Sequence, residues 1–161
     1  MSELYLMMTI TDRAVEKKFM SFYREKNLQV MLSTVGRGTA TNEVLDYLGL
    51  DEVEKVVCMS VVTGELWKEL KEGLQTSLQI DAPGMGIAFI IPMSSIGGKR
   101  QLRFLTENQN FTKGEETCLK DTKYELLMAV TNRGYTEKVM DAARAAGAAG
   151  GTVIHAKGSG M

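Results

Sequence analysis

Residues 4–13 read Leu-Tyr-Leu-Met-Met-Thr-Ile-Thr-Asp-Arg, an alternating apolar run that ends in Ile-Thr-Asp-Arg. A similar run recurs at residues 124–133, which end in Val-Thr-Asn-Arg. Each run leads into a helix-like segment and then a second apolar run that ends in Gly-x-Gly, at residues 36–38 and 158–160. Such self-similarity indicates an internal repeat. The second copy holds only a strand, a helix and a strand. We therefore expect either a piece of a longer protein or a half-unit that packs on another subunit.

The composition of the 161-residue chain excludes several function classes. Apolar residues make up 44% of it, as in ordinary globular proteins. A formal net charge of −1 provides no bulk attraction to nucleic acid or to an anionic membrane. The longest apolar stretch, residues 87–93, is far shorter than the roughly 20 residues of a membrane helix. We expect no nucleic-acid partner and no membrane insertion.

The N-terminal residues and the cysteines indicate a cytoplasmic protein. Glu3 is acidic, and neither a basic region nor a small-residue cleavage site is present, so no signal peptide is expected. Cys58 and Cys118 form no metal-binding motif, and Cys58 lies in a hydrophobic run typical of a buried reduced thiol. The single histidine, His155, has no metal-ligand residue at a suitable spacing and is expected to be structural.

Hydrophobic periodicity predicts four strands and two helices in the first copy. Asp12 is expected to cap the first helix, and Thr63 the second. The resulting order, β-α-β-β-α-β, is that of a ferredoxin-like domain, an α+β fold whose antiparallel sheet carries its helices on one face. The predicted strands comprise residues 4–10, 28–35, 56–62 and 87–93.

The predicted domains follow from the repeat. Residues 1–97 form the ferredoxin-like domain, and residues 98–122 form a polar linker for which we allow an extra strand at 101–105. Residues 123–161 form a partial second unit of the same kind. Its predicted elements are a strand at 124–131, a helix at 132–146 and a strand at 151–157.

Two glycine-rich turns are the candidate binding loops, Gly36-Arg37-Gly38 and Gly84-Met85-Gly86. Glycine lets backbone N–H groups approach a phosphate, and successive amides form an anion-binding nest. Arg37 would add a charge-assisted contact. In a ferredoxin-like sheet we expect the two turns to approach each other. The alternative, that both are ordinary turns, stays open on spacing alone, because neither a Walker nor a Rossmann fingerprint is present.

The order of these features resembles the nitrogen-regulatory PII signalling family. The segments that carry the resemblance are residues 34–39, 55–62 and 83–89. The resemblance extends from residue 4 to about residue 100, and a second PII-like unit begins at Tyr124. It implies a homo-oligomer, with a trimer favoured. It also implies a small-molecule effector bound between subunits and a long loop that contacts a regulatory target protein. The effector would be an adenine nucleotide (ATP, ADP or AMP), and neither catalysis nor a bound metal is implied.

The resemblance also assigns candidate ligand-binding residues by position. The sequence departs from the family pattern in the charges near them. Ile87 replaces an expected lysine, Ala40 an expected glutamine and Gly98 an expected arginine. Lost cations weaken the attraction for a triphosphate, so a diphosphate, a monophosphate, a cyclic nucleotide or another small anion is also considered. The candidates are Gly36, Arg37, Gly38 and Thr39 at the loop base, Gly84, Met85 and Gly86 in the phosphate-cradling loop, and Arg100 contributed by the neighbouring subunit.

Two other functions fit the same scaffold. An acylphosphatase-like hydrolase needs an arginine in an anion-cradling loop after the first strand and a nearby asparagine. Residues 131–134 mimic part of that loop, whereas Asp12 places a carboxylate where the anion should lie in the first copy. A trimeric metal-tolerance protein is the third alternative, which the lack of clustered Cys and His disfavours. Arg13 and Arg133 recur after the first strand of each copy, and helix-start ion pairs are the expected role.

Overall fold

The computed structural model describes residues 3–37, 54–112 and 124–159. The chain divides into two compact units. The first comprises residues 1–118 together with 156–161, and the second comprises residues 119–155. Each unit is described by itself.

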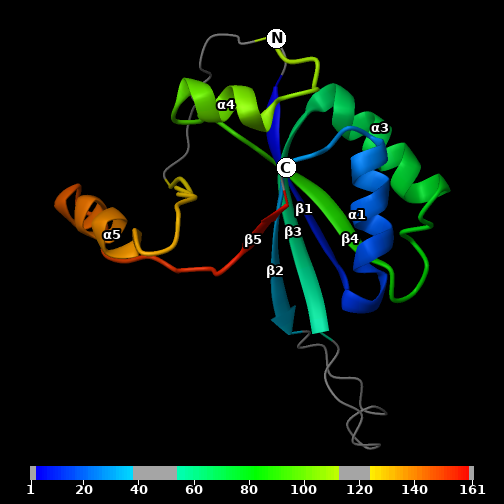
Figure 1. Cartoon of the computed structure of the whole chain (residues 1–161), viewed down its shortest axis with the longest axis horizontal. Coiled ribbons are helices and arrows are strands. Elements are labelled where there is room, and N and C mark those ends of the chain that lie inside the picture. The colour runs from blue at the N-terminus through cyan, green and yellow to red at the C-terminus, as the bar shows by residue number, and fades with distance from the viewer. Residues whose placement is uncertain (1–2, 38–53, 113–123, 160–161) are drawn as a thin grey trace, which may run out of the picture. The chain divides into compact units, whose positions relative to one another are not determined.

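The first unit confirms the predicted β-α-β-β-α-β order and adds the 3-10 helix η1, the helix α4 and the short strand β5 (Figure 1). Its elements are β1 (Leu4–Asp12), η1 (Arg13–Val15), α1 (Glu16–Glu25), β2 (Met31–Arg37), β3 (Glu54–Thr63), α3 (Gly64–Thr76), β4 (Gly86–Pro92), α4 (Lys99–Leu105) and β5 (Lys157–Ser159).

The strands form one five-stranded sheet in the order β4-β1-β3-β2-β5, and every neighbouring pair is antiparallel. The order β4-β1-β3-β2 is compatible with a ferredoxin-like arrangement. Helices α1 and α3 lie on one side of this sheet (Figure 1). The hydrophobic core lies between the helices and the sheet and comprises Met7, Phe19, Phe22, Tyr23, Leu28, Met31, Val62, Leu70 and Leu74.

Alternation along β1 decides which of its side chains enter this core. Met7, Thr9 and Thr11 point toward the helices and are at most 1% exposed. The Thr9 hydroxyl lies 2.6 Å from the Tyr23 hydroxyl, so two buried polar groups satisfy each other. Burial also raises the pKa of the Tyr23 hydroxyl, despite the opposing effect of the Thr9 hydrogen bond.

Two local predictions are confirmed at β3 and α3. The Thr63 side chain accepts a hydrogen bond from the Leu66 backbone N–H at 3.2 Å and thereby caps α3. Cys58 is 2% exposed, and burial raises the pKa of its thiol to about 11.

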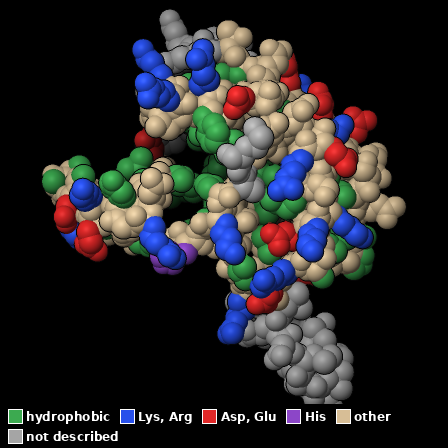
Figure 2. All heavy atoms as spheres, in the orientation of Figure 1, with side chains coloured by type: hydrophobic (Ala, Val, Ile, Leu, Met, Phe, Trp, Pro, Cys, Tyr) green, Lys and Arg blue, Asp and Glu red, His purple; other side chains and the backbone are tan. Residues whose placement is uncertain are grey.

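The opposite face of the sheet is also apolar. Ile87 and Ile91 of β4 pair with Ile10 and Leu6 of β1 and share this face with them. Ile87 remains 56% exposed and Ile91 37% exposed. On the helical side of the first unit, by contrast, Figure 2 shows acidic and basic side chains interspersed.

Gln109, in the segment expected to form a linker, hydrogen-bonds to an otherwise unpaired edge of β3. β2 pairs with β3 only from Arg37 to Leu32, so beyond Met59 this edge of β3 has no strand partner. The side-chain amide of Gln109 fills the gap. Its Oε1 accepts from the Thr63 N–H at 2.9 Å, and its Nε2 donates to the Val61 carbonyl at 2.8 Å.

Four secondary-structure predictions were wrong or only partly right. Residues 101–105 lie in helix α4 rather than in a strand. In the second unit, residues 124–131 form no strand, and the helix is α5 (Thr136–Ala145), shorter than expected. The predicted strand at 151–157 is displaced to β5, which pairs with β2 of the first unit. A complete β-α-β second unit is therefore not confirmed.

Among the described residues, no helix has both the length and the apolar character needed to cross a membrane.

Candidate functional site

The two glycine segments lie at the same end of the sheet. The predicted turn at residues 36–38 is not a turn in its described part, because Gly36 and Arg37 belong to β2. Gly36 near the end of β2 pairs with Lys55 at the start of β3, and Lys55 pairs in turn with Asp12 at the end of β1. Gly86 at the start of β4 pairs with Thr11. The antiparallel register therefore brings the ends of β1 and β2 and the starts of β3 and β4 together at one end of the sheet.

The turn before β4 needs glycine because of its close approach to β1. Gly86 has φ +132°, and a Cβ built on it would lie 2.3 Å from the Ile10 carbonyl oxygen. Gly84 has φ +79°, in the left-handed region. Thr11 Oγ1 donates to the Met85 carbonyl at 2.6 Å, and the Met85 side chain packs against the core. The turn is thereby held in one conformation against β1.

Two ion pairs, Lys55–Asp12 and Arg13–Glu54, lie at this end of the sheet. Lys55 Nζ donates to Asp12 Oδ1, and the two side chains are 33% and 22% exposed. Asp12 Oδ2 lies 3.6 Å from the position of a Cβ on Gly84, so this carboxylate borders the β4 turn. Arg13 donates to Glu54 at 2.5 Å, which confirms the expected ion pair of Arg13. The prediction that Asp12 caps the first helix was wrong, because Asp12 makes no side-chain cap.

The turns do not approach each other within one chain. β1 and β3 lie between β4 and β2. With neighbouring strands about 4.8 Å apart, three spacings separate the turns by about 14 Å. One phosphate cannot contact both turns of the same subunit. The expected approach of the two turns is therefore wrong for a single chain.

The remaining candidate residues are divided between the two ends of the sheet. Arg37 ends β2 opposite Glu54 and is exposed. Gly38 and Thr39 lie outside the described residues.

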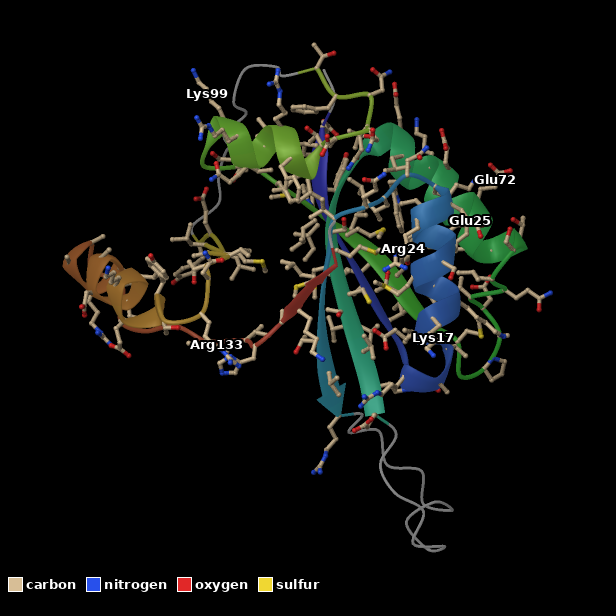
Figure 3. The ribbon with its side chains drawn as sticks, viewed as in Figure 1. Lys17, Arg24, Glu25, Glu72, Lys99 and Arg133 are labelled. Carbon is tan, nitrogen blue, oxygen red and sulfur yellow. The ribbon has the colours of Figure 1, made fainter. Side chains whose placement is uncertain are left out.

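Arg100 lies on α4, away from the glycine turns. The segment before α4 leaves β4 at Pro92, and the Met93 N–H donates to the Leu4 carbonyl at the opposite end of β1 from Asp12. Figure 1 shows α4 at the top of the first unit and the end of β2 at the bottom, and Figure 3 marks the start of α4 by Lys99. Seven residues of β4 span about 20 Å. Arg100 is therefore not brought to the turns of its own chain, and its contact with a neighbouring subunit stays a prediction.

Sequence reasoning missed three residues of this site: Thr11, Asp12 as an ion-pair partner, and Lys55. A signal for Lys55 was present, because it is the cation that immediately precedes the β-branched run of β3. What the sequence could not reveal is the register that sets Lys55 beside Gly36 and Asp12.

His155 and the possible metal ligands lie elsewhere or are dispersed. His155 is exposed and precedes β5 rather than lying within a strand. Among residues 3–37, 54–112 and 124–159, no three His, Cys, Asp or Glu side chains gather as a metal site would require.

Comparison with known proteins finds no protein-family model that matches the sequence and no curated protein that matches it.

Proposed function

We propose that this chain is a PII-like regulatory protein of nitrogen metabolism with a ferredoxin-like core. It binds a small anionic effector, an adenine nucleotide, at the sheet end that carries the two glycine turns. It passes the signal to a target protein through residues 38–53, which connect β2 and β3.

The observation that carries this proposal is the placement of Gly36, near the end of β2, and of the β4 turn at one end of the sheet. The β4 turn is held so close to β1 that Gly86 cannot carry a side chain. Gly84 and Gly86 have positive φ and carry no side chain that would screen the backbone of this turn, although the Met85 N–H between them already donates to the Ala82 carbonyl at 3.2 Å. Exposed backbone amides in such a turn favour an anion such as a phosphate.

The separation of about 14 Å between the turns supports a site shared by two subunits. Gly36 and Gly86 can contact one ligand only if each comes from a different copy of the chain. The exposed apolar side chains of Ile87 and Ile91 support the same assembly, because association would remove them from water. We propose a homotrimer, in keeping with the resemblance, with one cleft between each pair of subunits.

Lys55 is the cation we assign to the effector. Its ammonium is bound to Asp12, which is only partly exposed. An incoming phosphate competes with this carboxylate for Lys55. Because Gly36 is the cross-strand neighbour of Lys55, release of the ion pair alters the base of the connection between β2 and β3. This gives effector binding a route to the segment that contacts the target.

The test is calorimetric titration of the full chain with ATP, ADP, AMP and cyclic AMP, each with and without Mg²⁺ and 2-oxoglutarate. Lys55→Gln removes the cation and should weaken binding about tenfold or more, since a charged hydrogen bond contributes roughly 1.5–3 kcal/mol. Asp12→Asn removes the competing carboxylate and should strengthen binding. Arg24→Gln is the matched control, because Arg24 is an exposed cation of α1 (Figure 3).

Opposite effects of the Lys55 and Asp12 variants would support the proposal. Absence of binding by any adenine nucleotide, in a preparation whose far-ultraviolet circular dichroism shows a folded chain, would refute the nucleotide effector. Sedimentation velocity tests the trimer separately, and a monomer at all concentrations would refute the shared cleft.

The hydrolase alternative is less well supported by the geometry. The arginine that would hold the acyl phosphate in the first copy, Arg13, is bound to Glu54. Release of phosphate from acetyl phosphate by the full chain would favour the hydrolase over the regulatory protein.

A further inference from the structure

Strand β4 lies at an edge of the sheet and lacks the features that usually protect an edge strand. Among the described residues β1 is its only strand neighbour, and the two pair without a bulge from Gly86 to Pro92. Natural edge strands are blunted by charged side chains, bulges, prolines or short length. β4 has seven residues and no charged side chain, and its one proline is its last residue. Its outer edge is therefore open to a further strand.

Residues 124–130 have the opposite property, a strand-like sequence that forms no strand. Their sequence is Tyr-Glu-Leu-Leu-Met-Ala-Val, and the side chains of Leu126 and Leu127 are 80% and 89% exposed. A contiguous apolar run exposed in this way marks an interaction surface. The described chain thus has a strand edge without a partner and a strand-like segment without an edge, and it does not join the two itself.

The alternation of the segment matches the two faces of β4. In an extended strand, successive side chains point to opposite faces. One face of the segment would be wholly apolar and would carry Tyr124, Leu126, Met128 and Val130. Beside β4 this face would continue the open apolar face of the sheet, which carries Ile87, Phe89 and Ile91. The other face of the segment would then turn toward the helices.

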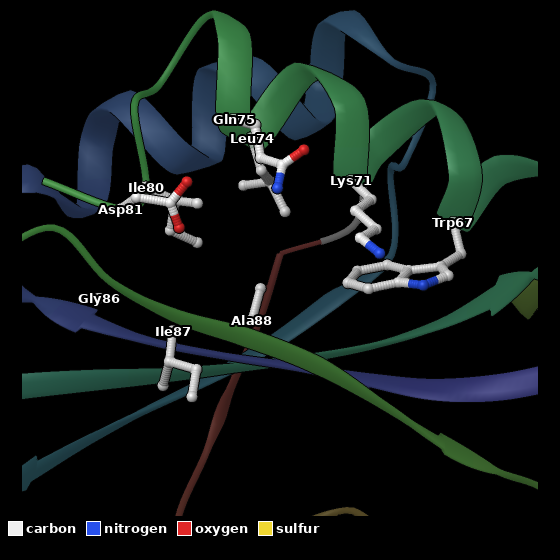
Figure 4. Close-up of a pocket in the computed structure, with 9 residues that line it drawn as sticks. All are labelled: Trp67, Lys71, Leu74, Gln75, Ile80, Asp81, Gly86, Ile87 and Ala88. Carbon is white, nitrogen blue, oxygen red and sulfur yellow. The ribbon is translucent and has the colours of Figure 1, made fainter.

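On the helical side there is room for one side chain of an added strand. A hollow of about 170 Å³ lies between α3 and β4 (Figure 4) and has apolar walls from Trp67, Ile80 and Ala88. A cavity of about 150 Å³ accommodates benzene, so this one can hold a leucine side chain. If Leu127 lies opposite Ala88, its side chain enters the hollow.

Charge decides the direction of the added strand in this register. Figure 4 shows Asp81 at the end of the hollow near Gly86 and Lys71 at the other end. Glu125 is the single charged residue of the segment. An antiparallel strand places Glu125 opposite Ile90, toward Lys71, whereas a parallel strand places it opposite Gly86, toward Asp81. Because like charges repel, the antiparallel direction is favoured.

We propose that residues 124–130 of one chain add as an antiparallel strand to β4 of a second copy of the chain. Leu127 then lies opposite Ala88, and Tyr124 lies opposite Ile91. Each copy donates one strand and accepts one, so the contact is head-to-tail and closes into a ring. The trimer proposed above is one such ring, but this strand contact does not depend on the nucleotide site.

The first test is disulfide cross-linking between two full chains that carry different affinity tags, both with Cys118→Ser. One chain carries Ile91→Cys and the other Tyr124→Cys, at positions that are 37% and 81% exposed. Mild oxidation of the mixture should join the two tagged chains. Ile87→Cys with Tyr124→Cys is the matched control, since four residues along β4 displace the sulfur by about 13 Å. A disulfide requires Cα atoms within about 7 Å, so the control should not cross-link.

The second test is sedimentation velocity over a range of concentrations. Leu127→Pro removes a backbone N–H and should raise the dissociation constant of the assembly about tenfold or more. The substitution lies in an exposed segment without regular structure, so each chain should keep its wild-type circular dichroism. Ala149→Pro is the matched control, because it introduces proline into another exposed segment without regular structure.

Three results would overturn the proposal. One is absence of a cross-link between the Ile91 and Tyr124 variants. The second is equal cross-linking of the Ile87 control, which would indicate unspecific apolar association. The third is a Leu127→Pro variant that associates as the wild type does. Failure of these tests leaves the nucleotide site standing, because that site is measured through Lys55 and Asp12.

Discussion

Replacement of Gly86 by alanine tests whether the close approach of the β4 turn to β1 is structurally required. The new methyl group would lie 2.3 Å from the Ile10 carbonyl oxygen and 3.0 Å from the Thr11 Cα, both backbone atoms that cannot rotate away. The φ of +132° is strained for any residue other than glycine. The start of β4 must therefore move away from β1.

The expected cost follows from three contributions. Backbone strain at a glycine-only φ costs about 1–3 kcal/mol. Movement of the turn also weakens the Thr11 hydrogen bond to the Met85 carbonyl and the adjacent strand pairing, at roughly 0.5–1.5 kcal/mol for each bond. Lower entropy of the unfolded alanine chain offsets about 0.4–1 kcal/mol. The net destabilisation is about 3 kcal/mol, which lowers the melting temperature of a chain of this length by about 6–12 °C.

The assay is thermal unfolding of the full chain followed by far-ultraviolet circular dichroism. Gly97→Ala is the matched control, because a Cβ on Gly97 meets no atom within 4 Å and its φ is not positive. The control should change stability by less than about 0.5 kcal/mol. A Gly86→Ala variant that melts within about 2 °C of the wild type would refute the reasoning.

Three further predictions concern the first unit. In Gly73→Ala the new methyl would lie 2.6 Å from the Phe22 ring. Overpacking costs about 1–3 kcal/mol and outweighs a helix-propensity gain of about 1 kcal/mol. The variant should therefore be less stable than the wild type in urea unfolding. Gln109→Glu loses the donor to the Val61 carbonyl and should destabilise the chain by about 1–3 kcal/mol in the same assay. Because burial raises the pKa of Cys58 from 9.0 to about 11, the folded chain keeps this proton while the unfolded chain loses it. The contribution of this proton to the free energy of unfolding is present below pH 9 and is lost as the pH rises to about 11. In Cys58→Ala this pH dependence should be absent.

Each of these three predictions has its own control or contrary result. Unchanged or raised stability of the Gly73 variant would show that the Phe22 ring moves aside without cost. Gln29→Glu makes the same chemical change at an exposed position and should have little effect. For the cysteine, the free energy of unfolding of wild type and Cys58→Ala is compared between pH 8 and pH 11. Parallel pH profiles would contradict the assigned role of the thiol.

Local signals were sufficient for most of the first unit. The alternation of β1, the apolar stripe of α3 and the β-branched run of β3 each depend on neighbours in the sequence, and each element forms where it was expected. The Thr63 cap and the burial of Cys58 were predictable for the same reason. Residues 101–105 were misjudged because Leu102 and Phe104 alternate with polar residues as in a strand, and the seven-residue helix is too short for a helical period to stand out.

The candidate site was predictable in its parts and not in its arrangement. The sequence identifies Gly84 and Gly86 as turn residues by composition alone, whereas Gly36 and Arg37, predicted as turn residues, lie in β2. It does not reveal that Lys55 binds Asp12, because the two residues are joined only by the register of β3 on β1.

What the sequence by itself determined is the identity and order of β1, α1, β2, β3, α3 and β4, since helical and strand periods are properties of a few consecutive residues. What only the tertiary structure decided is which elements are neighbours. Residues 124–130 have a strand-like sequence and form no strand, whereas three residues at 157–159 form β5 because β2 offers them an edge. A strand exists only when another strand satisfies its backbone hydrogen bonds, and that partner can lie more than a hundred residues away.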